Sequence, residues 1–390
     1  MSHLMNNYAR QAVAFTHGQG CLLFDEQGRR YLDGLAGIAV NTLGHNHPRL
    51  VAALSQQVTR LIHVSNLYRV KEQELLAERL AALSGMDEVF FCNSGCEANE
   101  AAIKLARMFG HQKGIDHPAI IVMEHAFHGR TLATLSATGN RKVQAGFEPL
   151  VPGFVRVPFA DLAAIEQVAA NNPNVVAVLF EPVQGEGGIN VANADFVRGL
   201  RRVCDQNGWL FMVDEVQCGI GRTGKWFAHQ HAGIQADVMT LAKGLGSGVP
   251  VGACLTAGPA AGVFKPGNHG STFGGNPLAC TAALTTLAVM EEGALLPRAI
   301  ALGERICARL RDQLAGLPAV VDIRNSGLMI GVELDRPCAV LVAAGLAAGI
   351  LINVTADKVV RLLPPLVMSD TEADELVDTL VVVLKAFLAG

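Results

Sequence analysis

The feature that most constrains the fold of this chain is a regular alternation of short apolar stretches with longer helical stretches, which begins near residue 75. Six of the short stretches are typical of buried strands, and they span Glu88 to Cys92, Ala119 to Met123, Val175 to Phe180, Trp209 to Val213, Val238 to Leu241 and Val251 to Leu255. Strands that alternate with helices favour a mostly parallel sheet covered by helices on both faces. The sequence therefore predicts an α/β fold with functional residues beyond the carboxyl ends of its strands.

Three of these strands lead to residues that carry chemistry. Glu181 follows one strand, Asp214 follows the next, and Lys243 comes shortly after Leu241 and opens a glycine-rich run. A lysine in such a place can become a nucleophile. The first strand delivers Ser94-Gly95-Cys96 at the start of a helix, where backbone amides can receive a phosphate. An amine, an acid and a phosphate cradle are the parts that bind pyridoxal phosphate.

The helix start at Ser94 and a second glycine-rich run each allow more than one interpretation. Ser94 and Glu97 form a capping box, so this segment can be an ordinary helix start, although Gly95 would let the backbone approach a ligand. The run from Gly219 to Lys225 contains GxGxxG and nearly GxxxxGK[ST], which opens a nucleotide-binding alternative. Trp226 stands where the second pattern requires a hydroxyl, and no helical pattern follows. We therefore favour a glycine-rich active-site loop for this run.

Composition argues against several classes of function. Half of the 390 residues are apolar and the formal net charge is −4, so no basic surface for nucleic acid is expected and a small molecule is the default partner. Nine cysteines without a CxxC pair are typical of a reduced, cytoplasmic protein. The histidine pairs lack further ligands, so we expect no metal site. The apolar run from Ala339 to Ile352 is too short to span a membrane, and it favours a buried helix or a helix plus a strand.

The ends of the chain differ in pattern from its centre. Cys21 to Leu32 reads as a hairpin around a glycine-containing turn, and Ser369 to Leu388 reads as an amphipathic helix that opens with a capping box. We expect an N-terminal segment (1–58) that forms part of a small domain, a large cofactor-binding domain (59–279) and a C-terminal small α/β domain (280–390).

A series of segments resembles the class III aminotransferases, which are pyridoxal-phosphate enzymes of fold type I. The resemblance covers nearly the whole chain and keeps the order and spacing of the family's motifs. The segments are Asn41 to Pro48, Asn93 to Glu100, Phe127 to Thr131, Glu181 to Gly188, Asp214 to Gln217, Gly221 to Gly224, Ala242 to Gly244, Gly270 to Pro277 and Arg361 to Pro365. So many ordered matches make the resemblance highly specific.

The resemblance implies a set of cofactor-binding residues. Lys243 is the lysine that would hold the cofactor's aldehyde and then carry protons, and Asp214 would pair with its ring nitrogen. Gly95 and Cys96 match the phosphate-binding pair; most relatives carry Ala or Thr where this chain has Cys96, but the backbone amide is what binds. The remaining matches are Phe127 stacked on the ring, Gln217 at the ring oxygen, and Thr272, which would reach the cofactor of the neighbouring subunit in a homodimer with shared sites.

The resemblance also implies how substrates bind. Arg130 would grip the carboxylate at the far end of the amino donor, and Arg361 would take the α-carboxylate of 2-oxoglutarate, because guanidinium groups bind carboxylates through two hydrogen bonds. Glu186 would pair with Arg361 when no α-carboxylate is present, and Ser271 would lie beside the substrate.

The donor is less strongly specified. Relatives that act on ornithine carry a tyrosine where this chain has Gly37 or Ile38. A smaller residue leaves space for an acyl group, which favours N-acetylornithine and the products N-acetylglutamate 5-semialdehyde and glutamate, a step of arginine biosynthesis. Succinylornithine, N-succinyl-diaminopimelate and ornithine remain alternatives, as does isomerisation by an aminomutase.

Overall fold

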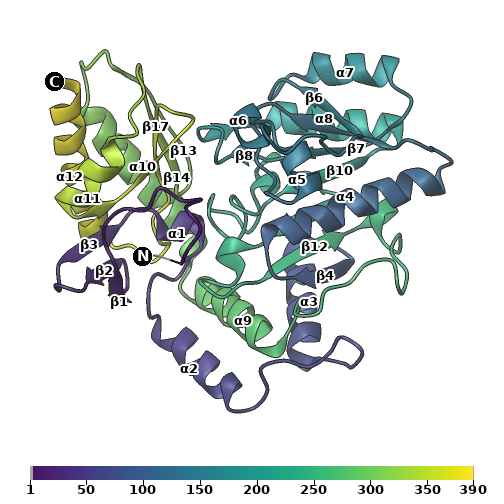
Figure 1. The fold of residues 1–390 in the computed structure, drawn as a ribbon, viewed down its shortest axis with the longest axis horizontal. Coiled ribbons are helices and arrows are strands. Elements are labelled where there is room, and N and C mark those ends of the chain that lie inside the picture. The colour runs from purple at the N-terminus through teal and green to yellow at the C-terminus, as the bar shows by residue number, and fades with distance from the viewer. Residues whose placement is uncertain (1–2, 390) are drawn as a thin grey trace.

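The computed structural model describes residues 3–389, which form two lobes with both ends of the chain in the same lobe (Figure 1). The larger lobe is built on a seven-stranded sheet with the order β4-β12-β11-β10-β7-β5-β6. Its strands are β4 (Glu88–Cys92), β5 (Ala119–Met123), β6 (Phe154–Val157), β7 (Val175–Phe180), β10 (Leu210–Asp214), β11 (Val238–Leu241) and β12 (Gly252–Thr256).

The sheet confirms the predicted α/β fold. All six expected strands are present, with shifts of one residue at β10 and β12, and β6 is an additional edge strand that the sequence did not predict. Only β12 runs against its neighbours; the pairs β11–β10, β10–β7, β7–β5 and β5–β6 are parallel. The parallel strands therefore end at the same edge of the sheet.

Helices cover both faces of this sheet, so its central strands are buried at every position and are apolar at all but Asp214 and Thr240. Alternate residues of the strands pack into two separate apolar clusters. One cluster joins the sheet to α4 (Gly95–Gln112) and α5 (Leu132–Ala137), and the other joins it to α7 (Leu162–Asn171) and α8 (Ala194–Asn207). The sheet is thus the middle of three layers.

The smaller lobe combines the two ends of the chain. Its first sheet has the order β1-β2-β3-β15, in which β3 (Arg30–Asp33) from the N-terminal part lies parallel to β15 (Ile350–Leu351) from the C-terminal part. The predicted hairpin is formed by β2 (Leu22–Asp25) and β3, and β1 is Phe15–Gln19. The second sheet contains β13 (Val320–Ser326), β14 (Met329–Leu334), β17 (Val359–Leu362) and β16 (Asn353–Thr355). The division at residues 58 and 279 stays a prediction.

Three helices of this lobe pack against its sheets: α10 (Leu295–Gln313), α11 (Leu341–Ala348) and α12 (Asp370–Ala389). The capping box predicted at Ser369 is formed, since Glu372 donates its backbone N–H to Ser369 Oγ over 3.2 Å and accepts from the Ser369 N–H over 2.8 Å. The apolar run from Ala339 becomes α11 followed by β15, as predicted. The remaining elements are α1 (Ala36–Ala39), α2 (Pro48–Val58), α3 (Lys71–Ser84), α6 (Arg141–Gln144), β8 (Val183–Gln184), β9 (Asn190–Val191), α9 (Pro277–Glu292) and three short 3₁₀ turns, Ala228–Ala232, Lys243–Leu245 and Gly258–Ala260.

Among residues 3–389, no single helix is long and apolar enough to cross a membrane. The pair α9 and α10 reaches that length and composition only when both helices are counted together across a bend of 69°. Helix α9 packs against α2 and α3.

Candidate active site

A cavity of about 340 Å³ lies at the carboxyl edge of the seven-stranded sheet. Strands β7, β10 and β11 end at it, β4 leads into one wall, and the antiparallel β12 begins beside it. Cavities of this size commonly hold small ligands and cofactors. Its lining includes six of the residues expected from the sequence: Gly95, Cys96, Phe127, Asp214, Gln217 and Lys243.

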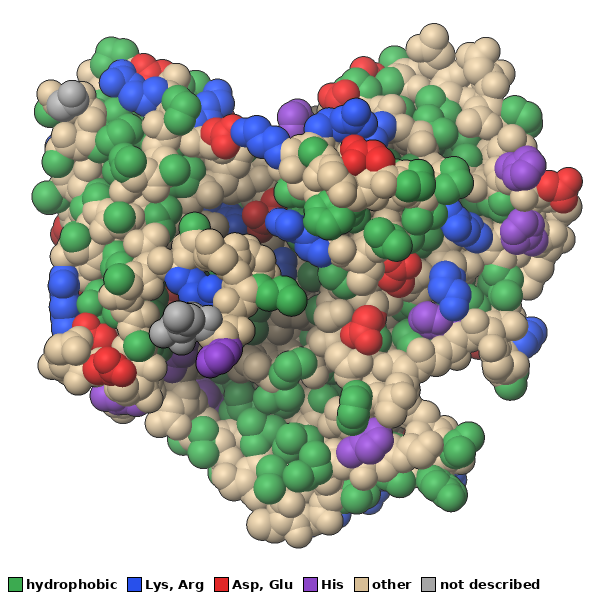
Figure 2. Space-filling model, in the orientation of Figure 1, with side chains coloured by type: hydrophobic (Ala, Val, Ile, Leu, Met, Phe, Trp, Pro, Cys, Tyr) green, Lys and Arg blue, Asp and Glu red, His purple; other side chains and the backbone are tan. Residues whose placement is uncertain are grey.

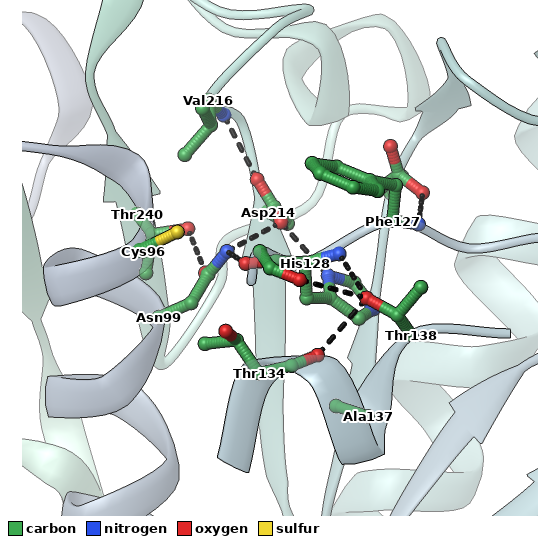
Figure 3. Close-up of polar contacts among 12 residues, drawn as sticks. Cys96, Asn99, Phe127, His128, Thr134, Ala137, Thr138, Asp214, Val216 and Thr240 are labelled. Carbon is green, nitrogen blue, oxygen red and sulfur yellow. Dashed lines mark hydrogen bonds and ion pairs between the residues drawn. The ribbon is translucent and has the colours of Figure 1, made fainter. Parts of the chain in front are cut away.

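Asp214 is the most firmly held of these residues. Its carboxylate is almost fully buried and accepts three hydrogen bonds, from the Val216 N–H to Oδ1 over 3.0 Å, and from Asn99 Nδ2 over 2.7 Å and His128 Nδ1 over 2.8 Å to Oδ2 (Figure 3). Asn99 in turn accepts from the hydroxyl of Thr240 over 2.7 Å. The acid at the end of β10 is therefore braced from α4, from the Phe127–His128 loop and from β11.

Lys243 opens a 3₁₀ turn at the end of β11, with its backbone in the left-handed region at a φ of 41°. The following turn is tied to the N-terminal part of the chain, since Thr42 donates to the Gly244 carbonyl over 3.1 Å and the Leu43 N–H donates to Ser247 Oγ over 3.0 Å. Burial lowers the pKa of the Lys243 amine below its ordinary 10.5, although nearby carboxylates, chiefly Glu186, oppose the shift. The site thus favours a neutral amine more than water does.

Glu181, at the end of β7, is the second acid in the cavity wall. One of its oxygens, Oε2, accepts the Phe127 N–H over 2.9 Å, which positions the ring of Phe127 at the cavity. Burial, together with the charge of Asp214, raises the pKa of Glu181 well above its ordinary value. The surroundings of Glu181 therefore disfavour its charged form.

The start of α4 forms another wall. Ser94 Oγ accepts the Glu97 N–H over 3.2 Å, as in a capping box. The Glu97 carboxylate accepts the backbone N–H of Asn93, over 2.8 Å, instead of that of Ser94. The first amides of a helix lack intrahelical partners and attract anions. A Cβ at Gly95 would lie 2.6 Å from Val216 Cγ1, so glycine is required for this approach. An anion cradle, an amine and an acid share one cavity, and this donor set fits pyridoxal phosphate.

Arg361 lies beside the cavity without lining it. Its fully buried guanidinium donates from Nη1 to Glu186 Oε1 over 2.6 Å and to Gln217 Oε1 over 3.2 Å, and Nε donates to Asn353 over 3.1 Å. Nη2 is buried and has no hydrogen-bond partner among residues 3–389. Although burial acts in the opposite direction, the charge of Arg361 keeps the pKa of Glu186 below its ordinary value. The expected pair between Glu186 and Arg361 is thus formed, with one donor atom unused.

The remaining predicted residues lie further out. Arg130 is exposed, with its guanidinium carbon 5.7 Å from the centre of the Phe127 ring, and its backbone N–H donates to Cys96 Sγ over 3.3 Å. Ser271 Oγ accepts from Asn93 over 3.2 Å. Thr272 is exposed and does not line the cavity of its own chain. The predicted action of Thr272 on the cofactor of a neighbouring subunit stays a prediction.

A second chamber of about 430 Å³ adjoins the first, because Phe127 lines both. Its wall also includes Glu186, the helix α6 and the turn between β16 and β17. At its rim, Lys142 of α6 contacts Asp357 of that turn over 2.7 Å, and both side chains are exposed. Figure 2 shows a deep notch between the two lobes, with basic and acidic side chains gathered along it. The two chambers give a substrate longer than the cofactor cavity room to extend.

Sequence reasoning missed Asn99, His128 and Thr240, and it gave Glu181 no role. A signal for Asn99 was present, because it is a polar residue inside the apolar stripe of α4, where it is 1% exposed. The loop from Gly219 to Lys225, by contrast, does not line the cavity. No α-helix follows it before the 3₁₀ turn at Ala228, as the sequence indicated.

Comparisons with known proteins agree with this geometry. Residues 4–384 match the family model of the class-III aminotransferases. An acetylornithine aminotransferase from Nitrosomonas europaea is 60% identical over 388 residues, which cover 100% of this chain and 99% of the relative. A structure of acetylornithine aminotransferase from Elizabethkingia anophelis has a TM-score of 0.88 at 34% identity, covering 99% of this chain and 97% of the other. An ornithine aminotransferase structure from Toxoplasma gondii, described with partial occupancy of PLP at its active site, has a TM-score of 0.94 at 35% identity, covering 99% and 92%.

The first prediction concerns the anion cradle. Replacing Gly95 with alanine should weaken binding of pyridoxal phosphate to the apoenzyme by about tenfold, because the new Cβ must displace Val216. Cys96→Ala is the matched control, since it keeps the backbone amide and should change the dissociation constant by less than about twofold. Titration of apoenzyme by visible absorbance measures both. Equal affinities for the two variants would show that the start of α4 does not bind the phosphate.

The second prediction concerns the Lys243 amine. In the apoenzyme, the rate at which Lys243 bonds to the aldehyde of pyridoxal phosphate should rise with pH and level off below pH 10.5, because burial lowers the pKa of this amine. Stopped-flow absorbance should be compared with the same reaction of Nα-acetyllysine in water, and Lys243→Arg controls for other lysines. A pH profile that matches Nα-acetyllysine would contradict the desolvated site.

Proposed function

The chain belongs to the class-III aminotransferases, which depend on pyridoxal phosphate, and from this premise we propose that it transfers the terminal amino group of N-acetylornithine to 2-oxoglutarate. The products would be N-acetylglutamate 5-semialdehyde and glutamate, in a step of arginine biosynthesis in the cytoplasm. The observation that carries the proposal is the meeting of Lys243, Asp214 and the start of α4 in one cavity, in a chain similar over its whole length to acetylornithine aminotransferases.

Lys243 and Asp214 would perform the chemistry shared by both half-reactions. When bound, pyridoxal phosphate supplies an aldehyde that bonds to amines and a ring that withdraws electrons from that bond. Lys243 would hold the aldehyde and, once displaced by the donor amine, move a proton from one carbon to the next with its Nζ. Its depressed pKa suits this work, because a base must be neutral to accept a proton. Asp214 would stabilise a proton on the ring nitrogen, which favours electron withdrawal.

Two arginines would let one site accept two unlike substrates in turn. Arg130 would bind the carboxylate at the far end of N-acetylornithine while Glu186 stays paired with Arg361. The α-carboxylate of 2-oxoglutarate would then displace Glu186 and take both the Nη1 donor and the unpaired Nη2 of Arg361. The second chamber supports this exchange, since its volume of about 430 Å³ leaves room for the distal part of the donor. Ser271 would lie beside the bound substrate.

The acyl group distinguishes this donor from ornithine. Gly37 and Ile38 lie in α1, at the place where ornithine enzymes carry tyrosine. Val40, two residues after Ile38, lines the cofactor cavity. Neither Gly37 nor Ile38 can hydrogen-bond a free α-amino group through its side chain, and Ile38 presents apolar surface. The lack of a hydroxyl at this position supports an acylated donor over ornithine.

We propose further that the enzyme is a homodimer with shared sites. Large apolar side chains are exposed on and around α2 and α3, and one of them, Phe273, adjoins Thr272. The others in this region are Val51, Val58, Leu61, Ile62, Leu67, Tyr68 and Leu75. Figure 2 shows apolar side chains gathered at the bottom of the view, over α2 and α9. Exposed apolar patches are typical of protein interfaces. A partner on this surface would explain why Thr272 lies outside the cavity of its own chain.

The third prediction tests the substrate. Steady-state kinetics with 2-oxoglutarate should give the highest kcat/KM for N-acetylornithine when it is compared with N-succinylornithine, ornithine and 4-aminobutyrate. Lys243→Ala should show no turnover with any of them. A clear preference for 4-aminobutyrate would contradict the role proposed for Arg130, because the carboxylate of that donor lies one carbon closer to its amine and the donor carries no acylamino group. Product formation without 2-oxoglutarate would instead indicate an aminomutase.

The fourth prediction tests the shared site. Co-expression of Lys243→Ala chains with Thr272→Val chains, each with its own affinity tag, yields mixed dimers. If Thr272 acts on the neighbouring site, one site of each mixed dimer contains both native residues, and activity should recover to about half of the wild-type value per dimer. Homodimers of each variant, purified by the same tags, are the controls. Activity per dimer of about half that of the Thr272→Val homodimer would place Thr272 in its own chain's site, because only one site of each mixed dimer would keep Lys243 and that site would carry valine at position 272.

A further inference from the structure

We propose that Thr240, Asn99 and His128 are positioning residues that hold the Asp214 carboxylate aimed at the cofactor cavity, an inference that rests on the function proposed above. None of the three was expected from the sequence. Thr240 does not line the cavity, and it acts through Asn99 alone. The argument follows from the donors and acceptors of a network in which every member is buried (Figure 3).

The amide of Asn99 has only one workable orientation. Its neighbours on one side are the Asp214 carboxylate at 2.7 Å and the His128 carbonyl at 2.8 Å, and both of these accept hydrogen bonds. The nitrogen Nδ2, with two protons, must face them. Oδ1 then faces the Thr240 hydroxyl, which donates over 2.7 Å. A reversed amide would set oxygen against two acceptors, so Thr240 locks Asn99 as a donor to Asp214.

His128 adds a second hydrogen-bond donor to Asp214. Nδ1 lies 2.8 Å from Asp214 Oδ2, and an ionised carboxylate can only accept, so Nδ1 carries the proton. Nε2 is buried and has no partner among residues 3–389. The ring therefore acts on the network through Nδ1 alone. This hydrogen bond stabilises the carboxylate and leaves its other oxygen, which accepts the Val216 N–H, able to face a proton on the cofactor as well.

The neighbouring acid shows what these donors contribute. Asp214 accepts from Val216, Asn99 and His128, whereas Glu181 in the same cavity accepts one hydrogen bond, from the Phe127 N–H. Burial and the charge of Asp214 raise the pKa of Glu181 well above its ordinary value. Hydrogen bonds donated to a carboxylate favour its charged form. The network therefore gives that stabilisation to Asp214 rather than to Glu181.

The network is tied to elements that also position the lysine. Thr240 is three residues before Lys243 on β11, and its carbonyl accepts the N–H of Glu215, the residue after Asp214, over 3.0 Å. Asn99 stands one helical turn after Gly95, on the face of α4 that meets the sheet. The acid, the amine and the anion cradle are thus held by adjacent positions of three packed elements.

The test compares two cofactors in the apoenzyme. One is pyridoxal phosphate, and the other is its analogue with C–H in place of the ring nitrogen, which keeps the aldehyde and the phosphate but offers Asp214 no proton. Thr240→Val removes the hydroxyl at nearly constant shape. It should weaken binding of pyridoxal phosphate by roughly tenfold and change binding of the analogue by less than about twofold. Thr240→Ser, which keeps the hydroxyl, should restore selectivity for the natural cofactor.

Controls separate positioning from folding. Thr286→Val removes another buried threonine hydroxyl, which donates only within α9, and should leave both dissociation constants unchanged. His128→Gln, measured in the same way, should reproduce the selective loss if Thr240→Val does not fold. An equal loss for both cofactors would mean a structural role only, and no loss for pyridoxal phosphate would mean no role; either result overturns the inference. Failure of the wild-type enzyme to transaminate would instead overturn the proposed function, since these binding measurements do not depend on turnover.

Discussion

The direction of the strands is the constraint on which the site depends. Strands β11, β10 and β7 are parallel neighbours, so their carboxyl ends bring Lys243, Asp214 and Glu181 to one edge of the sheet. β12 runs the other way, and it therefore begins where the others end, which closes the cavity with Val251. Residues that are far apart in sequence meet because hydrogen-bonded strands lie less than 5 Å apart.

This edge is buried, so each charge placed there needs a specific partner. An unpaired charge in a protein interior is costly, and removing one member of a buried pair is strongly destabilising. Asp214 has three hydrogen-bond donors, Arg361 has Glu186, and Lys243 loses part of its tendency to be protonated. Glu181 has one donor, and burial together with the charge of Asp214 raises its pKa well above its ordinary value. The geometry of the cavity therefore determines how well each charge is stabilised.

The parts of this structure that the sequence predicted are those decided locally. Apolar runs predicted the central strands because these strands are buried on both faces, and capping boxes predicted the starts of α4 and α12 because their hydrogen bonds span three or four residues. Strand β6 was missed because it lies at the edge and carries Arg156, whose guanidinium donates to the carbonyls of Ser136 and Thr138. The contacts of Asn99 with Asp214 and Thr240 join residues more than a hundred positions apart, which no local pattern encodes.

The glycine-rich run from Gly219 to Lys225 is a loop, as predicted, but it contacts the smaller lobe instead of lining the cofactor cavity. Arg222 within it is 3% exposed, and its guanidinium donates to the carbonyls of Leu328 and Pro364 in the smaller lobe. Burial lowers the pKa of Arg222 to about 10. Leu328 precedes β14 and Pro364 follows β17. These two strands are paired, and β17 contains Arg361. The loop that leaves Asp214 thus braces the strand pair that presents Arg361 to Glu186, so the positions of the acid at the cofactor cavity and the arginine beside it are mechanically linked.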